Sequence, residues 1–166
     1  MIHVVVDTNV PIVVNRRASN ASLQCVLACV RRLRQIQAEQ VLVLDSGWLI
    51  LHEYADNLCS EGQPGVGDAF FRWVLTNRKN TQRCQLVDLT PLPSANGEMG
   101  FAEFPDSPDL DGFDYSDRKF AAVANAHPTH PPILNAVDSD WQQYLDALTK
   151  QGIRVEFLCG ALPLRN

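Results

Sequence analysis

The sequence has 166 residues, 46% of them hydrophobic, which is enough for one domain with a sizeable core. No apolar run approaches the roughly 20 residues that span a bilayer, and Asp7 interrupts the first hydrophobic stretch, so we expect no membrane span, no signal peptide and a cytoplasmic protein. The net charge of −5 does not exclude a nucleic-acid partner, because seven of the 19 acidic residues lie between Glu98 and Asp117, which leaves 12 acidic against 14 basic residues elsewhere.

Strand and helix patterns alternate along the chain. Apolar runs predict strands near residues 2–6, 41–44, 84–88, 133–137 and 154–158. Apolar residues at helical spacing predict helices between them, at 23–33, 48–58, 70–75, 120–126 and 141–148. This order is typical of an α/β fold, and we expect three α/β/α layers with a central, mostly parallel sheet of about five strands.

The segment from Thr90 to Tyr115 is rich in proline, glycine and acidic residues and has no clear period. We interpret it as an acidic surface insertion at about 90–115, within a single domain that spans residues 1–166.

The cysteines are odd in number and include no Cys-x-x-Cys pair; they are Cys25, Cys29, Cys59, Cys84 and Cys159. This pattern indicates neither a zinc site nor a disulfide framework, so we predict reduced and mostly buried thiols. Cys25 and Cys29 have helical spacing and are interpreted as core residues.

Four of the predicted strands end in an aspartate or directly before one, at Asp7, Asp45, Asp88 and Asp138. This position matters because ligands of parallel sheets gather at the carboxyl ends of the strands. Asp45 directly precedes a helical pattern and is interpreted as a helix cap. Asp88 precedes a proline-containing turn, which explains it without a ligand.

Asp7 and Asp138 are the stronger candidates. Asp7 could also be a helix cap, because Thr8 and Asn9 follow it. Asp138 and Asp140 flank a serine at the end of an apolar strand, and one acid is enough for a cap. The second carboxylate is a candidate ligand.

Two further acids lie in predicted helices. Glu53 lies at the edge of an apolar stripe, where a salt bridge to an arginine or simple exposure would explain it. Asp117 opens a helix, where a negative charge is stabilising in itself. Together with Asp7 and Asp138, however, these acids could converge at one edge of the sheet. Four carboxylates there would repel one another, and a hard divalent cation such as Mg²⁺ or Mn²⁺ would resolve that conflict.

Four segments in this order resemble the PIN-domain family: 4–10 around Asp7, 51–54 around Glu53, 113–120 around Asp117, and 135–141 around Asp138. The resemblance covers residues 4 to about 158. The sequence departs from the family at Ala136, where a threonine is frequent, and in the acidic insertion, which is longer than in compact members.

The resemblance implies a Mg²⁺- or Mn²⁺-dependent endoribonuclease that cleaves single-stranded RNA and leaves a 5′-phosphate and a 3′-hydroxyl. It implies that four acids hold the metal and orient the attacking water, namely Asp7, Glu53, Asp117 and Asp138. It also implies that Asp140 is an auxiliary acid, either a further metal contact or a support for the other ligands, and that Asn9 steadies the first strand-end loop. Such a protein could be the toxic half of a toxin–antitoxin pair or another stress or defence effector, with an antitoxin-like protein or a second copy as partner.

Two basic pairs, Arg16 with Arg17 and Arg118 with Lys119, are weak candidates for contacts with RNA phosphates. Two other functions remain open. One is a binding module that keeps the acidic pocket without appreciable cleavage. The other is a phosphatase with Asp7 as nucleophile, although Asn9 stands where that chemistry would normally place a second acid.

Overall fold

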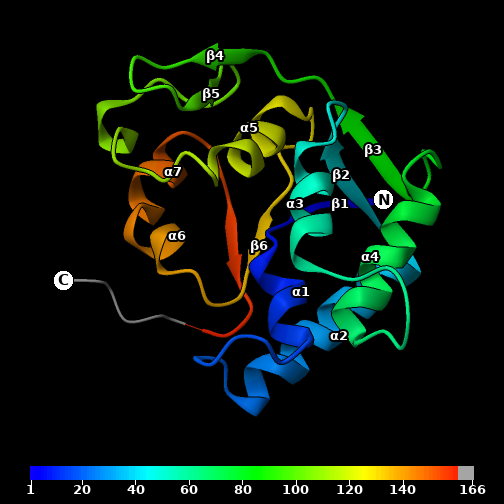
Figure 1. The fold of residues 1–166 in the computed structure, drawn as a ribbon. Helices are drawn as coiled ribbons and strands as arrows, with labels where there is room; N and C mark the ends of the chain where they lie inside the picture. The colour runs from blue at the N-terminus through cyan, green and yellow to red at the C-terminus, as the bar shows by residue number, and fades with distance from the viewer. Residues whose placement is uncertain (161–166) are drawn as a thin grey trace.

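The central sheet of the protein, seen in a computed structural model that describes residues 1–160, has five strands in the order β3-β2-β1-β6-β7 (Figure 1). The strands are β1 (Ile2–Val6), β2 (Gln40–Asp45), β3 (Cys84–Val87), β6 (Ile133–Asn135) and β7 (Val155–Phe157). All neighbouring pairs in this sheet are parallel. The predicted α/β fold with a parallel sheet of five strands is therefore confirmed.

Helices cover the sheet on both faces (Figure 1). They are α1 (Asn9–Val14), α2 (Leu23–Glu39), α3 (Leu49–Asn57), α4 (Val66–Asn77), α5 (Arg118–Ala126), α6 (Ser139–Gln143) and α7 (Leu145–Lys150). Helices α1, α2 and α4 pack against one another, whereas α3 packs with α5. Helix α1 was not predicted, because its six residues are too few to show a helical period.

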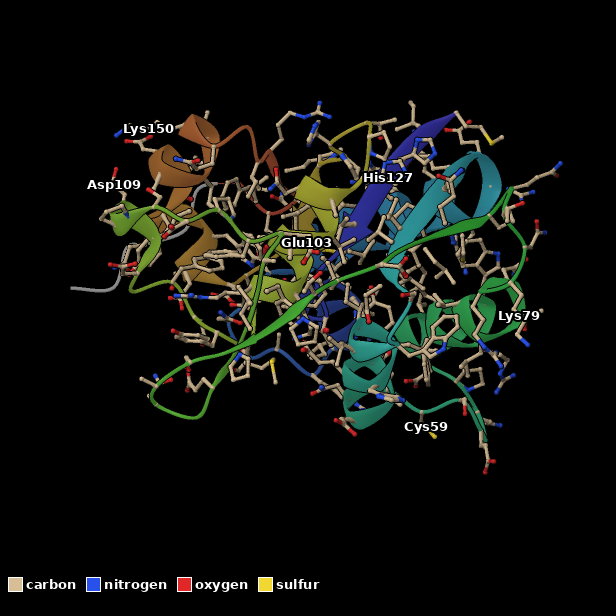
Figure 2. The ribbon with its side chains drawn as sticks, turned by 90° about the horizontal axis from the view of Figure 1, so that it is seen from above. Cys59, Lys79, Glu103, Asp109, His127 and Lys150 are labelled. Atoms are coloured by element: carbon tan, nitrogen blue, oxygen red, sulfur yellow. A yellow bond between two sulfur atoms is a disulfide. The ribbon has the colours of Figure 1, made fainter. Side chains whose placement is uncertain are left out.

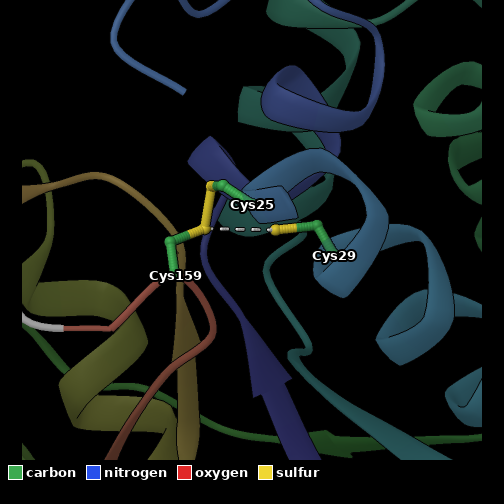
Figure 3. Close-up of side chains that lie close together, drawn as sticks. All are labelled: Cys25, Cys29 and Cys159. Atoms are coloured by element: carbon green, nitrogen blue, oxygen red, sulfur yellow. Dashed lines mark hydrogen bonds between the residues drawn. A yellow bond between two sulfur atoms is a disulfide. The ribbon is translucent and has the colours of Figure 1, made fainter. Parts of the chain in front are cut away.

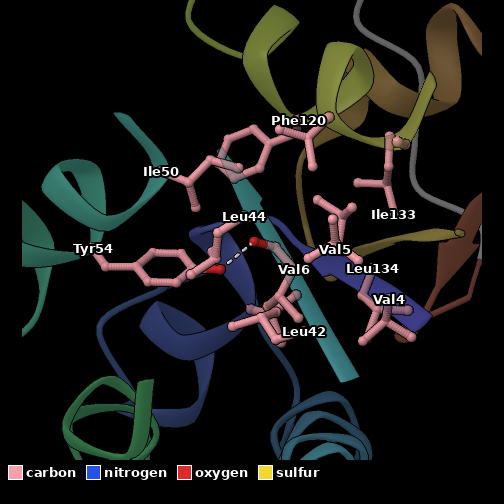
Figure 4. Packing of buried hydrophobic residues seen from close by; sticks show 14 of the residues in the cluster. Val4, Val5, Val6, Leu42, Leu44, Ile50, Tyr54, Phe120, Ile133 and Leu134 are labelled. Atoms are coloured by element: carbon pink, nitrogen blue, oxygen red, sulfur yellow. Dashed lines mark hydrogen bonds between the residues drawn. The ribbon is translucent and has the colours of Figure 1, made fainter. Parts of the chain in front are cut away.

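The core lies where the central strands meet α3 and α5 (Figure 4). Its labelled members are all nearly inaccessible to solvent: Val4, Val5, Val6, Leu42, Leu44, Ile50, Tyr54, Phe120, Ile133 and Leu134. The Tyr54 hydroxyl donates a hydrogen bond of 2.6 Å to the Val6 carbonyl, which satisfies the one polar group that this ring brings into the core. This bond also fixes α3 against the end of β1.

Side-chain caps set where several helices begin. Ser22 accepts a hydrogen bond from the Cys25 amide at the start of α2. The Asp45 carboxylate accepts from the Leu49 and Ile50 amides at 2.7 and 2.9 Å, so the predicted capping role of Asp45 is confirmed.

The acidic insertion is more ordered than the sequence suggested. It contains an antiparallel hairpin of β4 (Pro91–Pro93) and β5 (Met99–Phe101), followed by the short 3₁₀ helix η1 (Pro108–Leu110). Four of its apolar side chains are buried, at Phe101, Phe104, Leu110 and Phe113. The insertion is therefore at the surface but shares the hydrophobic core of the domain.

Polar contacts stabilise the insertion internally and connect it to the rest of the domain (Figure 2). Glu103 accepts hydrogen bonds from the Thr90 amide and hydroxyl, and its carbonyl accepts one from Asn125 of α5. Asp109 of η1 forms an ion pair of 3.6 Å with Lys150 of α7. Both charged groups of that pair are largely exposed, so it contributes little free energy of folding.

One prediction about the cysteines is wrong. Cys25 and Cys159 form a disulfide across a sequence separation of 134 residues, whereas reduced thiols were expected. The pairing was hidden because the two residues have no local spacing pattern and meet only in the folded chain. Cys29 and Cys84 are buried thiols as predicted, and Cys59 is exposed.

Within residues 1–160, no helix combines the length and the apolar character needed to cross a bilayer.

Candidate metal centre at the carboxyl edge of the sheet

Asp7 directly follows β1, next to the point where the strand order reverses between β1 and β6. Its side chain is only 3% exposed. One carboxylate oxygen accepts a hydrogen bond of 2.8 Å from the Asn9 amide, and the other accepts one of 2.7 Å from the indole nitrogen of Trp141. Both oxygens are thus held in place by the protein.

Burial raises the pKa of Asp7 from its ordinary value of 3.8 to about 7, and repulsion from Asp138 and Glu53 adds to that rise. The hydrogen bonds from Asn9 and Trp141 oppose it but are too weak to cancel it. Asp7 is therefore a buried carboxylate whose negative charge the surrounding groups do not fully compensate.

Asp117 and Asp138 reach the same place from other elements. Asp117 directly precedes α5 and accepts no capping hydrogen bond. Asp138 caps α6, because its carboxylate accepts a hydrogen bond of 2.9 Å from the Asp140 amide. Oxygen atoms of Asp7, Asp117 and Asp138 all lie within 4.8 Å of one another.

The pKa of Asp117 is raised further than that of Asp7. Burial raises its pKa from 3.8 to about 9, and the charges of Asp7, Asp138 and Asp114 raise it further than the nearby Lys119 lowers it. A second trio of carboxylates shares this residue, since Asp114, Asp117 and Asp140 also place oxygens within 4.8 Å of one another. Asp117 is the member common to both trios.

Asn9 and Asn135 join the two strand ends that carry Asp7 and Asp138. The Asn9 side chain donates to Asn135 at 2.8 Å and accepts from the Ala136 amide at 2.8 Å. Asn135 in turn donates to the Asp138 carbonyl at 2.9 Å. These bonds hold the loops after β1 and β6 together, as the sequence interpretation of Asn9 would require.

Glu53 lies apart from both trios. Its carboxylate accepts a hydrogen bond of 2.6 Å from Thr8 and forms an ion pair with Lys119. The four acids were expected to lack a compensating cation, but Glu53 has a cationic neighbour. The partner is a lysine two residues beyond Asp117, not the arginine considered above.

The basic candidates differ in how accessible they are. Arg118 donates to carbonyls of the insertion, and its guanidinium lies 3.8 Å from the centre of the Tyr115 ring. Lys119 is buried against Glu53 and the Ser116 carbonyl. A phosphate would have to compete with these internal partners. Arg16 and Arg17 follow α1 and are exposed.

A pocket of about 440 Å³ opens beside Glu53. It lies between α3 and the insertion, with apolar walls that include Leu49, Met99 and Tyr115. Glu53 and Lys119 also line it, and the charge of Lys119 acts on Asp117, whose pKa it lowers.

The donor set suits a hard divalent cation. All ligand atoms available from the two trios are carboxylate oxygens, which Mg²⁺ and Mn²⁺ prefer. Burial, with repulsion between the acids, raises the pKa values of Asp7 and Asp117, and a bound cation would oppose both effects.

Sequence reasoning missed Trp141, Asn135 and Asp114 as parts of this site. Trp141 looked like an apolar helix residue, and only its contact with Asp7 reveals its polar function. Asp114 lies in the segment 113–120 that resembles the family, three residues before Asp117, and this position was the available signal.

Comparisons with protein-family models, with curated proteins and with solved structures found no match. We therefore infer the chemistry of the site from its own residues.

Proposed function

We propose that the protein is a divalent-metal-dependent endoribonuclease of the PIN type, which hydrolyses phosphodiester bonds of single-stranded RNA. The observation that carries this proposal is the convergence of Asp7, Asp117 and Asp138, whose oxygens lie within 4.8 Å of one another. These acids come from the ends of two parallel strands and the start of a helix, at the reversal of the strand order where α/β proteins bind their ligands.

Asp7, Asp117 and Asp138 are the residues that would hold Mg²⁺ or Mn²⁺, with Asp114 and Asp140 able to contribute on the outer side of Asp117. When bound, such an ion supplies Lewis acidity toward a phosphodiester and lowers the pKa of water. Two metal ions would be compatible with the two trios that share Asp117.

The surrounding residues orient these carboxylates before any ligand arrives. Trp141 and the Asn9 amide hold the two oxygens of Asp7, while the Asp140 amide holds Asp138. Fixed ligands lose little conformational freedom on binding, which favours a defined geometry. Because Thr8 and Lys119 engage Glu53, we assign Glu53 a positioning role beside the metal ligands.

RNA as the substrate follows from the resemblance of the four motifs to the PIN-domain family. The mainly apolar pocket between α3 and the insertion supports an unpaired nucleic acid, whose bases need apolar contact surface. A role as a toxin or defence effector, with an antitoxin-like protein or a second copy as partner, stays a prediction.

Cleavage of labelled RNA tests the proposal. Single-stranded RNA, structured RNA and single-stranded DNA are incubated with Mn²⁺, Mg²⁺ or EDTA. Asp138→Asn is the informative variant, because asparagine caps a helix as well as aspartate does and the start of α6 should be preserved. Asp88→Asn is the matched control, since Asp88 also follows a strand but is exposed and outside both trios.

We expect metal-dependent cleavage of single-stranded RNA by the wild type and by Asp88→Asn, and a loss of at least 100-fold in Asp138→Asn. Cleavage that persists in EDTA, or that Asp138→Asn retains in full, would contradict the proposal. Metal binding without cleavage of any substrate would favour the binding module instead.

A further inference from the structure

Three cysteine sulfurs meet near the end of β7, in a group separate from the aspartate trios (Figure 3). Cys25 and Cys29 lie in α2, and Cys159 follows β7. Cys25 and Cys159 form a disulfide, and all three sulfurs lie within 4.8 Å of one another. A purely structural disulfide needs two cysteines, so the third requires an explanation.

The third sulfur is directed at the disulfide. Cys29 Sγ lies 3.8 Å from Cys159 Sγ. A disulfide sulfur carries no hydrogen, so the Cys29 thiol must be the donor in this contact. Because Cys25 and Cys29 are four residues apart on one helix, they present their sulfurs on the same face, and Cys159 lies against both.

Other contacts keep Cys159 near α2 independently of the disulfide. Arg32 of α2 forms an ion pair of 3.0 Å with Glu156 of β7. The Leu158 amide donates to the Asn135 carbonyl at 2.9 Å, which extends the pairing of β7 with β6. Opening the disulfide would therefore leave Cys159 within reach of both cysteines of the helix.

We propose that Cys25, Cys29 and Cys159 form a thiol–disulfide exchange set, in which Cys159 pairs with either helix cysteine and so fastens the end of β7 to α2. In the exchange, the Cys29 thiol loses its proton to solvent and the thiolate attacks Cys159 Sγ. The Cys29–Cys159 bond forms, the Cys25–Cys159 bond breaks, and Cys25 leaves as a thiolate that takes up a proton. The reaction needs no added oxidant, because one disulfide replaces another.

Burial determines how fast this exchange occurs. Desolvation raises the pKa of the Cys29 thiol to about 12, so little thiolate is present at neutral pH in the closed structure. Exchange from the observed Cys25–Cys159 pairing is therefore slow, and it accelerates at alkaline pH or when a small thiol opens the disulfide. This inference does not depend on the nuclease proposal.

Peptide mapping tests the exchange set. All proteins carry Cys59→Ser, because the exposed Cys59 could form disulfides between molecules. They are equilibrated with reduced and oxidised glutathione at pH 8.5, quenched with acid, alkylated and digested with chymotrypsin. Cleavage after Leu27 separates Cys25 from Cys29, so mass spectrometry distinguishes the two pairings.

We expect Cys25→Ser to contain the Cys29–Cys159 disulfide in most molecules, and Cys29→Ser to contain only Cys25–Cys159. A folded Cys25→Ser protein in which both remaining cysteines of the set stay reduced would overturn the proposal. Should that variant fail to fold, the protein with all three cysteines decides. Both pairings should then appear during partial reduction, and detection of the Cys25–Cys159 pairing alone would overturn the proposal.

Discussion

Trp141 links the packing of the insertion to the position of Asp7. Its ring is fully buried and packs edge-on against Phe113 of the insertion, with the ring centres 5.0 Å apart. Its indole nitrogen donates a hydrogen bond of 2.7 Å to Asp7. Residues that orient a metal-binding side chain in this way usually affect metal affinity and activity strongly themselves.

Replacing Trp141 with phenylalanine should keep most of the apolar packing and remove the hydrogen bond to Asp7. We expect metal affinity and RNA cleavage to fall about 10- to 100-fold. Trp73→Phe is the control, because Trp73 stacks on Phe70 and, among the contacts of the described residues, has no hydrogen bond to Asp7. Equal effects of the two substitutions on cleavage would show that Trp141 acts through packing alone.

Asp117→Asn should stabilise the metal-free protein while abolishing cleavage. The folded protein raises the pKa of Asp117 from 3.8 to about 9, so its favourable contribution is complete below pH 3.8 and is lost as the pH rises toward 9. Asparagine does not titrate, and no capping hydrogen bond is lost. At pH 8.5 in EDTA, we expect the variant to be more stable by about 1 kcal/mol or more.

Thermal unfolding at pH 4 and pH 8.5 checks the sign of that effect. The advantage of Asp117→Asn should be small at pH 4 and larger at pH 8.5. A variant that is less stable than the wild type at pH 8.5 would mean that Asp117 has favourable partners that outweigh its repulsion.

At the scale of elements, hydrophobic periodicity was sufficient for the sheet and most helices. Residues 4–6 and 133–134 are apolar because both faces of those strands are buried there, and this constraint is visible in the sequence. The insertion was less predictable, because its buried aromatics are spaced irregularly by turns. The sequence also indicated which acids stand at strand ends. It did not indicate that Lys119 would pair with Glu53, because the two residues meet only in the folded chain.

The disulfide between α2 and the end of β7 should contribute measurably to stability. Its ring closes a separation of 134 residues, and a disulfide of this kind typically adds about 2–4 kcal/mol. Reduction with dithiothreitol should lower the melting temperature by roughly 5–15 °C for a domain of this size. A melting temperature that is the same with and without reductant would show that the bond adds no stability.

At the scale of the whole molecule, the topology assembles the candidate metal centre. Asp7 and Asp138 are far apart in sequence, yet β1 and β6 are neighbours, and α5 packs on β1 and so places Asp117 beside them. Each acid alone had an adequate structural explanation in the sequence. The strand order explains why these acids lie close together, because β1 and β6 are neighbours at the point where the order reverses.

The most direct test of the central claim is a calorimetric titration of the metal-free protein with Mn²⁺ at pH 8. If Asp7, Asp117 and Asp138 hold the cation, the wild type and Asp88→Asn should bind Mn²⁺ equally, and Asp138→Asn should bind at least 10-fold more weakly. Equal affinity in Asp138→Asn, or no saturable binding to the wild type, would contradict the assignment of the three aspartates as a metal centre.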